Sequence, residues 1–314
     1  MTAPLPLDDE ARCGVVVAAT SRDAILRMAR RCEALGFDSL WMGDHVSFYV
    51  PILESLSLLS FLAAATERVQ LGTSVYLLPL RRPAIAAKTV ASVDVLSGGR
   101  MIFGIGVGGE FPPEFEACGV PVAERGSRTD EAIGILRRLW SENGVSHQGR
   151  HFRFGPVSLD PKPVQPGGPP IWVGGRREPA FRRAGRLADG YISHMTAAAT
   201  YRANLESMAR HAEAAGRRIG RFGTAAFLFT VLDDEYEKAL DRAGQMLSVV
   251  YNRPFRDAAA RYCLLGRPED CLEQMRGFAA AGARHFVLSP LSDPLEFAER
   301  AGAGILREVP GLVR

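Results

Sequence analysis

Asp44 and His45 stand next to each other directly after a short apolar run that has the composition of a buried strand. Histidine can exchange a proton near neutral pH, and a neighbouring carboxylate could orient its ring or raise its pKa. An isolated histidine is more often a hydrogen-bonded residue without a chemical role. The interpretation of His45 as a base therefore depends on where the fold places it.

A second candidate is Glu110, which follows the glycine-rich segment GIGVGG (104–109). A carboxylate beside an apolar surface can have a raised pKa and act as an acid, although a solvated loop acid is the commoner case. The glycines Gly108 and Gly109 are expected to let a planar ring approach the backbone.

The same segment formally contains GxGxxG, which in dinucleotide-binding proteins opens a helix and is followed by an acid at the end of the next strand. Here Pro112 and Pro113 are expected to prevent a helix from opening at once. The acids about 20 residues later, Asp130 and Glu131, lie within a predicted helix. We therefore reject a Rossmann-type site.

A third candidate is the turn formed by Gly174, Gly175 and Arg176, which joins an apolar run to an amphipathic stretch. Free backbone N–H groups at a helix N-terminus favour an anion, and an arginine adds a charged donor. The alternative is a tight turn with solvated arginines. The turn predicts a phosphate-binding site if it lies at the carboxyl end of a strand.

The elements that must position these residues repeat along the chain. Short apolar runs predict strands, and amphipathic stretches such as 21–36, between the N-cap Ser21 and the helix stop Gly36, predict helices. The predicted strands are 13–19, 39–44, 69–75, 101–108, 171–175, 190–193, 222–231 and 285–290. The other predicted helices include 54–66, 83–97, 124–141, 198–215, 233–261 and 268–282.

Such alternation predicts βαβ units and a parallel sheet that is buried on both faces. Eight evenly distributed strands favour a closed (β/α)8 TIM barrel, an α/β fold, over an open doubly wound sheet. The Gly- and Pro-rich stretch 143–170 breaks the rhythm after strand 4 and predicts a surface insertion with a hairpin. We expect residues 1–314 to form a single domain.

In such a barrel the active site lies on the loops that follow the strands. Asp44–His45, Ser74–Val75, Gly108–Glu110, Gly174–Arg176 and His194 would then converge on one mouth. His194, Tyr49 and Phe48 are candidates for lining a substrate pocket. His285 begins the last predicted strand at the opposite end and is expected to be structural.

Composition excludes several other classes of protein. The 314 residues are 47% hydrophobic and 23% charged, with a net charge of +3 and no basic run, so no nucleic-acid partner is expected. No secretory signal or membrane-spanning run is visible, so the cytoplasm is the expected location. The five cysteines lack CxxC spacing, which predicts reduced, buried thiols and no metal site.

Together these pieces resemble the luciferase-like flavin- and coenzyme F420-dependent oxidoreductases. The matching segments are ALGFDSLWMGDH (34–45), residues 67–110, 124–140, HQGRHF (147–152), PKPVQPGGPPIWVGG (161–175) and ADGYIS (188–193). The resemblance covers residues 14 to 195 well and is thin beyond them. It implies a barrel with an insertion after strand 4, usually dimeric, that acts on a small-molecule substrate.

The resemblance also implies roles for individual residues. Ser74–Val75 matches a non-prolyl cis peptide that is pressed against the cofactor ring, and Asp44, Gly108 and Gly109 are expected beside that ring. The turn Gly174–Gly175–Arg176 matches the family's phosphate site. His45 would act as base and Glu110 as acid, and Tyr49 stands where sugar-phosphate dehydrogenases often have tryptophan.

Three functions stay open at this point. The first is hydride transfer between coenzyme F420 and a small organic substrate. The second is an FMN-dependent monooxygenase that uses reduced FMN and oxygen. The third is a barrel that binds flavin without catalysis, or has lost it. The short chain, GTSV (72–75) and Asp44–His45 favour F420.

Overall fold

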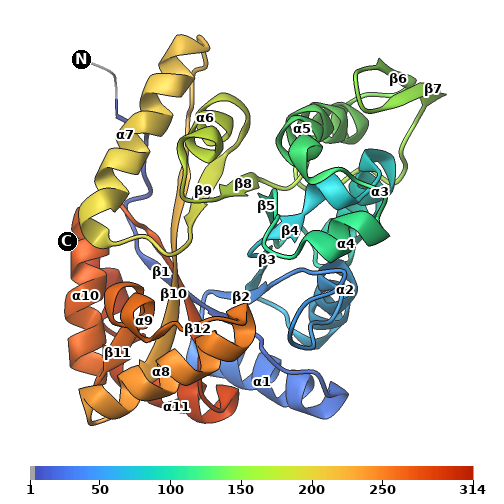
Figure 1. Cartoon of the computed structure of the whole chain (residues 1–314). Helices are drawn as coiled ribbons and strands as arrows, with labels where there is room; N and C mark the ends of the chain where they lie inside the picture. Colours follow the sequence, from blue (N-terminus) through green and yellow to red (C-terminus); the bar gives the residue numbers. More distant parts are fainter. Residues whose placement is uncertain (1–3, 314) are drawn as a thin grey trace.

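A closed barrel of eight parallel strands forms the centre of the protein (Figure 1). The structure is a computed structural model and describes residues 4–313. Each strand pairs in parallel with the next, and the barrel closes because β10 pairs with both β9 and β12, and β12 pairs with β1. The barrel strands are β1 (Arg12–Val16), β2 (Ser39–Met42), β3 (Gln70–Thr73), β5 (Met101–Gly106), β8 (Ile171–Gly174), β9 (Gly190–Ser193), β10 (Gly223–Leu232) and β12 (His285–Pro290). The predicted (β/α)8 barrel is confirmed.

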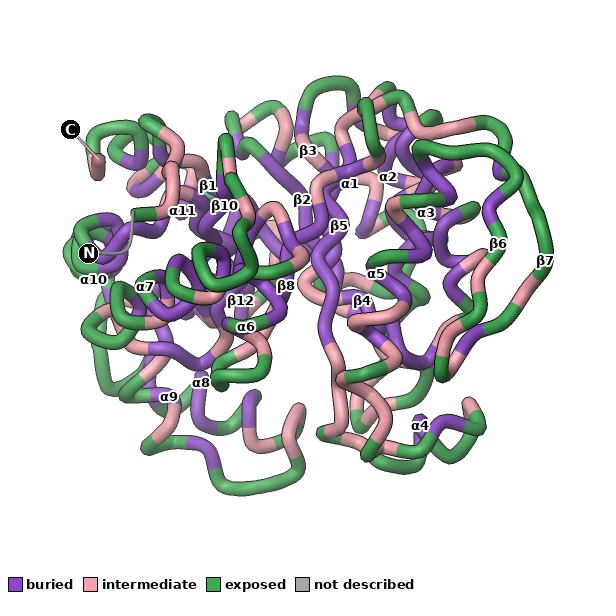
Figure 2. The backbone as a smooth tube through the Cα atoms, turned by 90° about the horizontal axis from the view of Figure 1, so that it is seen from above, coloured by how far each residue is buried: buried purple, intermediate pink, exposed green. Residues whose placement is uncertain are grey.

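The helices surround the barrel, so that buried backbone lies at the centre and exposed backbone at the periphery (Figure 2). The first helix begins as predicted, with the Ser21 hydroxyl accepting from the Ala24 N–H, and it ends at Gly36 with φ 94°. The helices are α1 (Arg22–Leu35), α2 (Ser55–Ala65), α3 (Pro83–Leu96), α4 (Pro112–Ala117), α5 (Arg125–Ser141), α6 (Glu178–Leu187), α7 (Ala198–Ala214), α8 (Tyr236–Tyr251), α9 (Arg256–Tyr262), α10 (Pro268–Ala280) and α11 (Pro294–Gly304).

The insertion after the fourth barrel strand contains an antiparallel hairpin, β6 (Val145–Gln148) and β7 (Arg153–Val157), at the edge of the molecule (Figure 1). This agrees with the sequence prediction for 143–170. Two short strands were not predicted, β4 (Tyr76–Leu77) and β11 (Leu264–Gly266). The predicted helical region 233–261 is two helices, because Asn252 adopts a left-handed conformation with φ 50° and ends α8.

His285 lies at the amino-terminal end of the barrel, inside a cluster with Trp41 and Trp172. Its Nε2 is 2.7 Å from the Ser39 hydroxyl, which also accepts the Trp41 indole N–H at 2.7 Å. The imidazole packs edge-on against both indoles, at 5.4 and 5.7 Å between ring centroids. The prediction of a structural role for His285 agrees with this place in the core.

The burial of His285 makes stability depend on pH. Burial lowers its pKa to about 3, whereas the ordinary value is 6.5. The imidazole in the unfolded chain binds a proton more readily than the buried one. The folded state is therefore fully favoured by the neutral His285 above about pH 6.5. As the pH falls from there toward 3, the free energy of unfolding decreases by roughly 1.4 kcal/mol per pH unit. Urea denaturation at pH 7 and pH 5 should show this loss, and His285→Gln should reduce it. An equal loss in the variant would contradict the assignment.

Candidate active site

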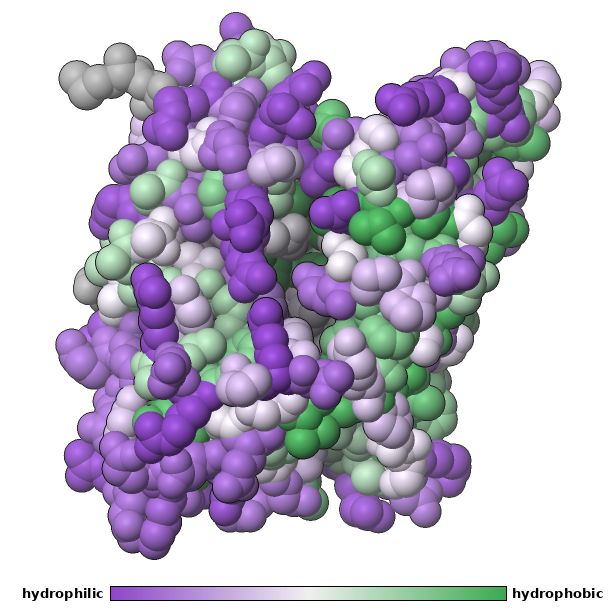
Figure 3. Space-filling view, viewed as in Figure 1, coloured by the Kyte–Doolittle hydropathy of each residue, from purple (hydrophilic) through white to green (hydrophobic). Residues whose placement is uncertain are grey.

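The loops that follow the barrel strands meet at one end of the barrel, because all eight strands run in the same direction. The face seen in Figure 3 is hollowed near its centre, between the parts of the surface over α8 and α4, with hydrophilic side chains along one border. We call this hollow and the strand ends behind it the mouth.

His45 lies at the mouth and is oriented by Glu114, a residue of α4. The Nδ1 atom of His45 is 3.1 and 3.2 Å from the two carboxylate oxygens of Glu114, whose side chain is fully buried. The Val46 N–H donates to the same carboxylate at 3.1 Å. Because an ionised carboxylate can only accept, Nδ1 carries a proton, and in the neutral form of the imidazole Nε2 has a free lone pair. Among residues 4–313 no hydrogen-bond partner lies at this Nε2.

The prediction that Asp44 orients His45 is wrong. Asp44 is buried and accepts hydrogen bonds from the Leu77 N–H at 2.9 Å and the Ser55 hydroxyl at 3.2 Å. It also forms an ion pair with Arg81 at 2.8 Å. Its oxygens are therefore engaged in tying the segment after β3 to α2. A direct contact of Asp44 with a cofactor stays a prediction.

The Ser74–Val75 peptide bond is cis, as the resemblance implied. The Val75 side chain lies over the barrel interior, between the ends of β5 and β8. A Cβ atom at Gly106 would lie 2.3 Å from Val75, and one at Gly174 would lie 2.6 Å from it. Only glycine at both positions leaves room for this valine. The hydroxyl oxygen of Ser74 is buried and has no hydrogen-bond partner among the described residues.

Gly108 and Gly109 form a turn after β5 with φ values of 60° and 112°, a conformation that favours glycine. The expectation that the prolines prevent a helix is wrong, because α4 begins at Pro112. Proline suits the first helical position, where its missing N–H would have no helical partner. The glycines are not at that helix N-terminus, so the rejection of a Rossmann site does not change.

Arg176 lies in the turn between β8 and α6, as predicted, and is exposed. No ion pair of Arg176 is present within residues 4–313, and no side chain caps the N-terminus of α6. Glu178, in the first turn, accepts from the Ser207 hydroxyl at 2.9 Å and pairs with His211 at 2.6 Å on α7. The first turn of α6 is therefore an exposed, positively polarised site.

His194 follows β9 and contacts Tyr251 on α8, with 3.3 Å between Nε2 and the hydroxyl oxygen. The pKa of His194 is lowered to about 4, mainly by burial and also by Arg176, while Glu110 acts in the opposite direction. The same two charged residues act on the pKa of Tyr251, which burial raises. Arg176, Glu110, His194 and Tyr251 therefore share one side of the mouth, and His194 is neutral at pH 7.

Several residues of the mouth were not predicted from the sequence. Glu114 lies on α4, a helix that was not predicted because it begins with two prolines. The other residues that were not predicted are aromatic. Tyr251 lies on α8, and Phe111 precedes α4. Phe227 and Phe229 on β10 lie 5.8 and 6.0 Å from the His194 ring. Their alternate spacing on one strand, which points both rings to the same side, was the available signal.

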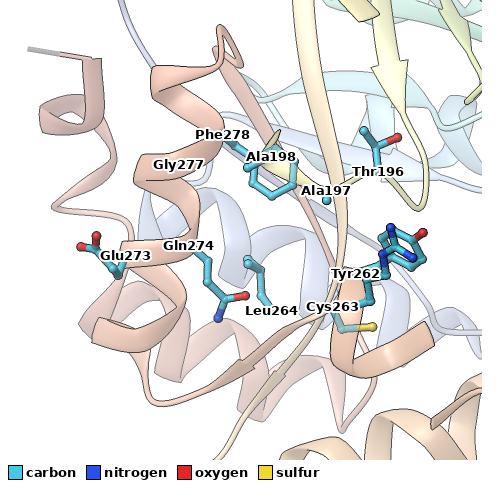
Figure 4. Close-up of a pocket in the computed structure, with 11 residues that line it drawn as sticks. Thr196, Ala197, Ala198, Tyr262, Cys263, Leu264, Glu273, Gln274, Gly277 and Phe278 are labelled. Atoms are coloured by element: carbon cyan, nitrogen blue, oxygen red, sulfur yellow. The ribbon is translucent and has the colours of Figure 1, made fainter. Parts of the chain in front are cut away.

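A separate cleft of about 240 Å³ lies on the flank of the barrel, where α7, α9 and α10 meet (Figure 4). Burial raises the pKa of the Cys263 thiol in this cleft to about 12, so the thiol is not a nucleophile at neutral pH. None of the predicted site residues lines it. Four of the five cysteines are buried, as predicted, whereas Cys118 is partly exposed.

Comparison with known proteins identifies the family of the chain. The sequence model of the luciferase-like monooxygenases matches residues 9–285. The chain belongs to this family. The luciferase-like chain is 28% identical to the F420-dependent glucose-6-phosphate dehydrogenase of Nakamurella multipartita, over 91% of this chain and 92% of that enzyme. It is 32% identical to the FMNH2-dependent dimethylsulfone monooxygenase of Pseudomonas putida, over 60% of this chain and 52% of that enzyme.

The fold of the luciferase-like chain also matches solved structures. An F420-dependent secondary alcohol dehydrogenase in complex with an F420–acetone adduct superposes with a TM-score of 0.83 and 25% identity. The match covers 97% of this chain and 99% of that one. Among the residues described, no helix is both long and apolar enough to cross a membrane, and no cluster of three metal-ligating side chains occurs.

Proposed function

We propose that this protein is an F420-dependent oxidoreductase that moves a hydride to or from a carbon bearing oxygen in a small organic substrate. The observation that carries the proposal is the His45–Glu114 pair, a base whose free nitrogen lies at a glycine-lined barrel mouth. Two proteins matched over nearly their whole length, the Nakamurella multipartita enzyme and the secondary alcohol dehydrogenase, are F420-dependent dehydrogenases by name.

The residues present fit such a cofactor. A planar ring would rest on Val75, beside the turn of Gly108 and Gly109. The buried Ser74 hydroxyl, which lacks a protein partner, would face the same ring. The anionic phosphate-bearing part of the cofactor would lie at the N-terminus of α6, beside Arg176.

Coenzyme F420, when bound, supplies the carbon that accepts or donates the hydride. The protein's own groups handle the proton. In the direction of alcohol oxidation, the substrate carbon loses a hydride with its electron pair, and the hydroxyl proton passes to Nε2 of His45. The Glu114 carboxylate stabilises the imidazolium that forms. Glu110, an exposed residue on the side of the mouth that it shares with Arg176 and His194, would be a second proton-exchanging group.

We predict that Arg176→Ala raises the Kd for F420 by about 10- to 100-fold, because a charge-assisted contact contributes roughly 1.5–3 kcal/mol. A titration that follows cofactor fluorescence would measure it. Arg182→Ala, which removes an exposed arginine from the same helix, is the control. Equal Kd values for Arg176→Ala and the unaltered protein would remove Arg176 from the site.

The FMN monooxygenase is the second candidate, supported by the partial match to the dimethylsulfone enzyme. The two functions differ in their need for oxygen. We expect reduction of F420 by a secondary alcohol to proceed equally with and without dissolved oxygen. Oxygen consumption that requires reduced FMN would move the protein to the second candidate, and the absence of both reactions would favour a non-catalytic barrel.

We propose further that the protein is a homodimer that buries the outer face of α3. Ile85 and Leu96 are 67% and 62% exposed on that helix, and Val164 is 55% exposed beside its end. Large apolar side chains exposed on one helix and beside its end are a feature of interfaces between subunits.

Leu96→Glu is expected to shift the protein from dimer to monomer, because the new charge would be buried without a partner. Light scattering after gel filtration measures the mass. Val249→Glu, at a position on α8 that is 65% exposed, should leave the dimer intact. A Leu96→Glu dimer would place the interface elsewhere. The five free thiols support a reducing compartment, for which we propose the cytoplasm.

A further inference from the structure

The two imidazoles of the mouth are joined by a wall of aromatic rings. Phe48 stacks on His45 with 3.9 Å between ring centroids and an interplanar angle of 14°. Tyr251 meets Phe48 edge-on at 6.5 Å and lies 6.4 Å from both His194 and Phe229. Rings from the loop after β2, from β10 and from α8 therefore form one surface, although they are far apart in the sequence.

A second group of rings extends this wall outward. Phe111 lies 6.1 Å from Phe48 and 4.9 Å from Tyr49, both in edge-on contacts. Phe48, Phe111, Phe229 and Tyr251 are only half-buried, and Tyr49 is 46% exposed. Core rings are normally covered on all sides. Half-exposed rings that converge on a functional site instead offer apolar surface to a ligand.

The wall carries little charge. Its internal polar contact is the hydrogen bond between His194 and Tyr251, and both groups are neutral at pH 7. Among residues 4–313 one arginine, Arg183, is buried. Its guanidinium forms an ion pair with Asp130 between α5 and α6. Two exposed arginines lie near the wall: Arg253, which stacks over Phe255, and Arg176, proposed above for the cofactor, and both act on the pKa of Tyr251. Among the described residues no buried, unpaired cation lies in the wall itself, so a phosphorylated substrate would lack an enclosed cation there.

We propose that the substrate is an uncharged secondary alcohol, or its ketone, that carries an aromatic or cyclic apolar group. This inference rests on the proposed F420-dependent function. The reacting oxygen faces Nε2 of His45, and the apolar group packs against Phe48 and Tyr251. The chain would therefore differ in substrate class from the sugar-phosphate dehydrogenases named above, although it resembles them over nearly its whole length.

The first test is binding without turnover. Acetophenone, acetone and glucose 6-phosphate are titrated by calorimetry into the chain, both free and loaded with oxidised F420. We expect acetophenone to bind at least about ten-fold more tightly than acetone, because ring contacts add to burial. Tighter binding of glucose 6-phosphate than of acetophenone would overturn the inference. Failure to bind F420 would instead count against the proposed function. In that case the titrations of the cofactor-free chain would still show whether the wall prefers acetophenone to acetone.

The second test is a matched pair of variants. Phe48→Ala, in a half-buried loop position, should lower the affinity for acetophenone by about ten-fold and leave acetone nearly unchanged. Tyr236→Ala removes an exposed ring at the other end of α8 from Tyr251 and should change neither. In Phe48→Ala the rate of turnover of 1-phenylethanol, divided by that of 2-propanol, should fall by the same factor of about ten. An unchanged preference for the aromatic ligand in Phe48→Ala would contradict the role of the wall.

Discussion

Replacing His45 by alanine is expected to lower turnover by about 10²- to 10⁴-fold, the range typical of losing a general base. The imidazole is the group whose free nitrogen lies at the mouth, and its other nitrogen is held by Glu114 at 3.1 Å. The affinity for F420 should stay within a few-fold, because His45 is on a different loop from the turn at Arg176. Steady-state kinetics and a fluorescence titration on the same preparation would separate the two effects.

A suitable control for this variant is His147→Ala. His147 forms a comparable pair with Glu131, at 2.9 Å, but in the β6–β7 hairpin outside the mouth. Its loss should leave turnover and F420 affinity unchanged. Turnover in His45→Ala that equals that of the control would exclude His45 as the base.

Glu114→Gln is expected to reduce kcat on the order of 100-fold, less than loss of the base itself. Glutamine keeps the shape of the side chain and can still accept from the Val46 N–H, so α4 should stay in place. The missing charge no longer favours the protonated imidazole, so the acidic limb of the pH–rate profile should move to lower pH. A merely structural role would leave this limb where it is.

Glu116→Gln provides the matched comparison, because Glu116 is an exposed acid on the same helix. It should leave kcat and the pH profile unchanged. If Glu114→Gln lowered the thermal stability and kcat together without moving the acidic limb, Glu114 would be a structural residue and the orientation of His45 would need another explanation.

The fold was predictable because its strands are short apolar runs separated by amphipathic stretches, and this pattern depends on local periodicity. The hairpin at 143–170 was equally visible, because glycine and proline mark turns wherever they cluster. The break at the left-handed Asn252, which splits one predicted helix into α8 and α9, was overlooked although Pro254 marked it, because proline is common just beyond a helix end.

The site was predictable only in part. Residues directly after strands, such as His45 and Arg176, could be placed because a parallel barrel fixes where strands end. Glu114 could not, because its contact with His45 spans 69 positions and its helix starts at a proline that was interpreted as a breaker. Tyr251 was missed for a similar reason, since an aromatic residue on an amphipathic helix is usually a packing residue.

The most direct test of the account is a side-by-side equilibrium titration of the purified protein with F420 and FMN, followed by fluorescence quenching. The proposed function, supported by the F420-dependent enzymes matched over nearly the whole chain, predicts tight binding of F420 and weak binding of FMN. The reverse preference, or no binding of either cofactor, would contradict the proposed hydride transfer with F420.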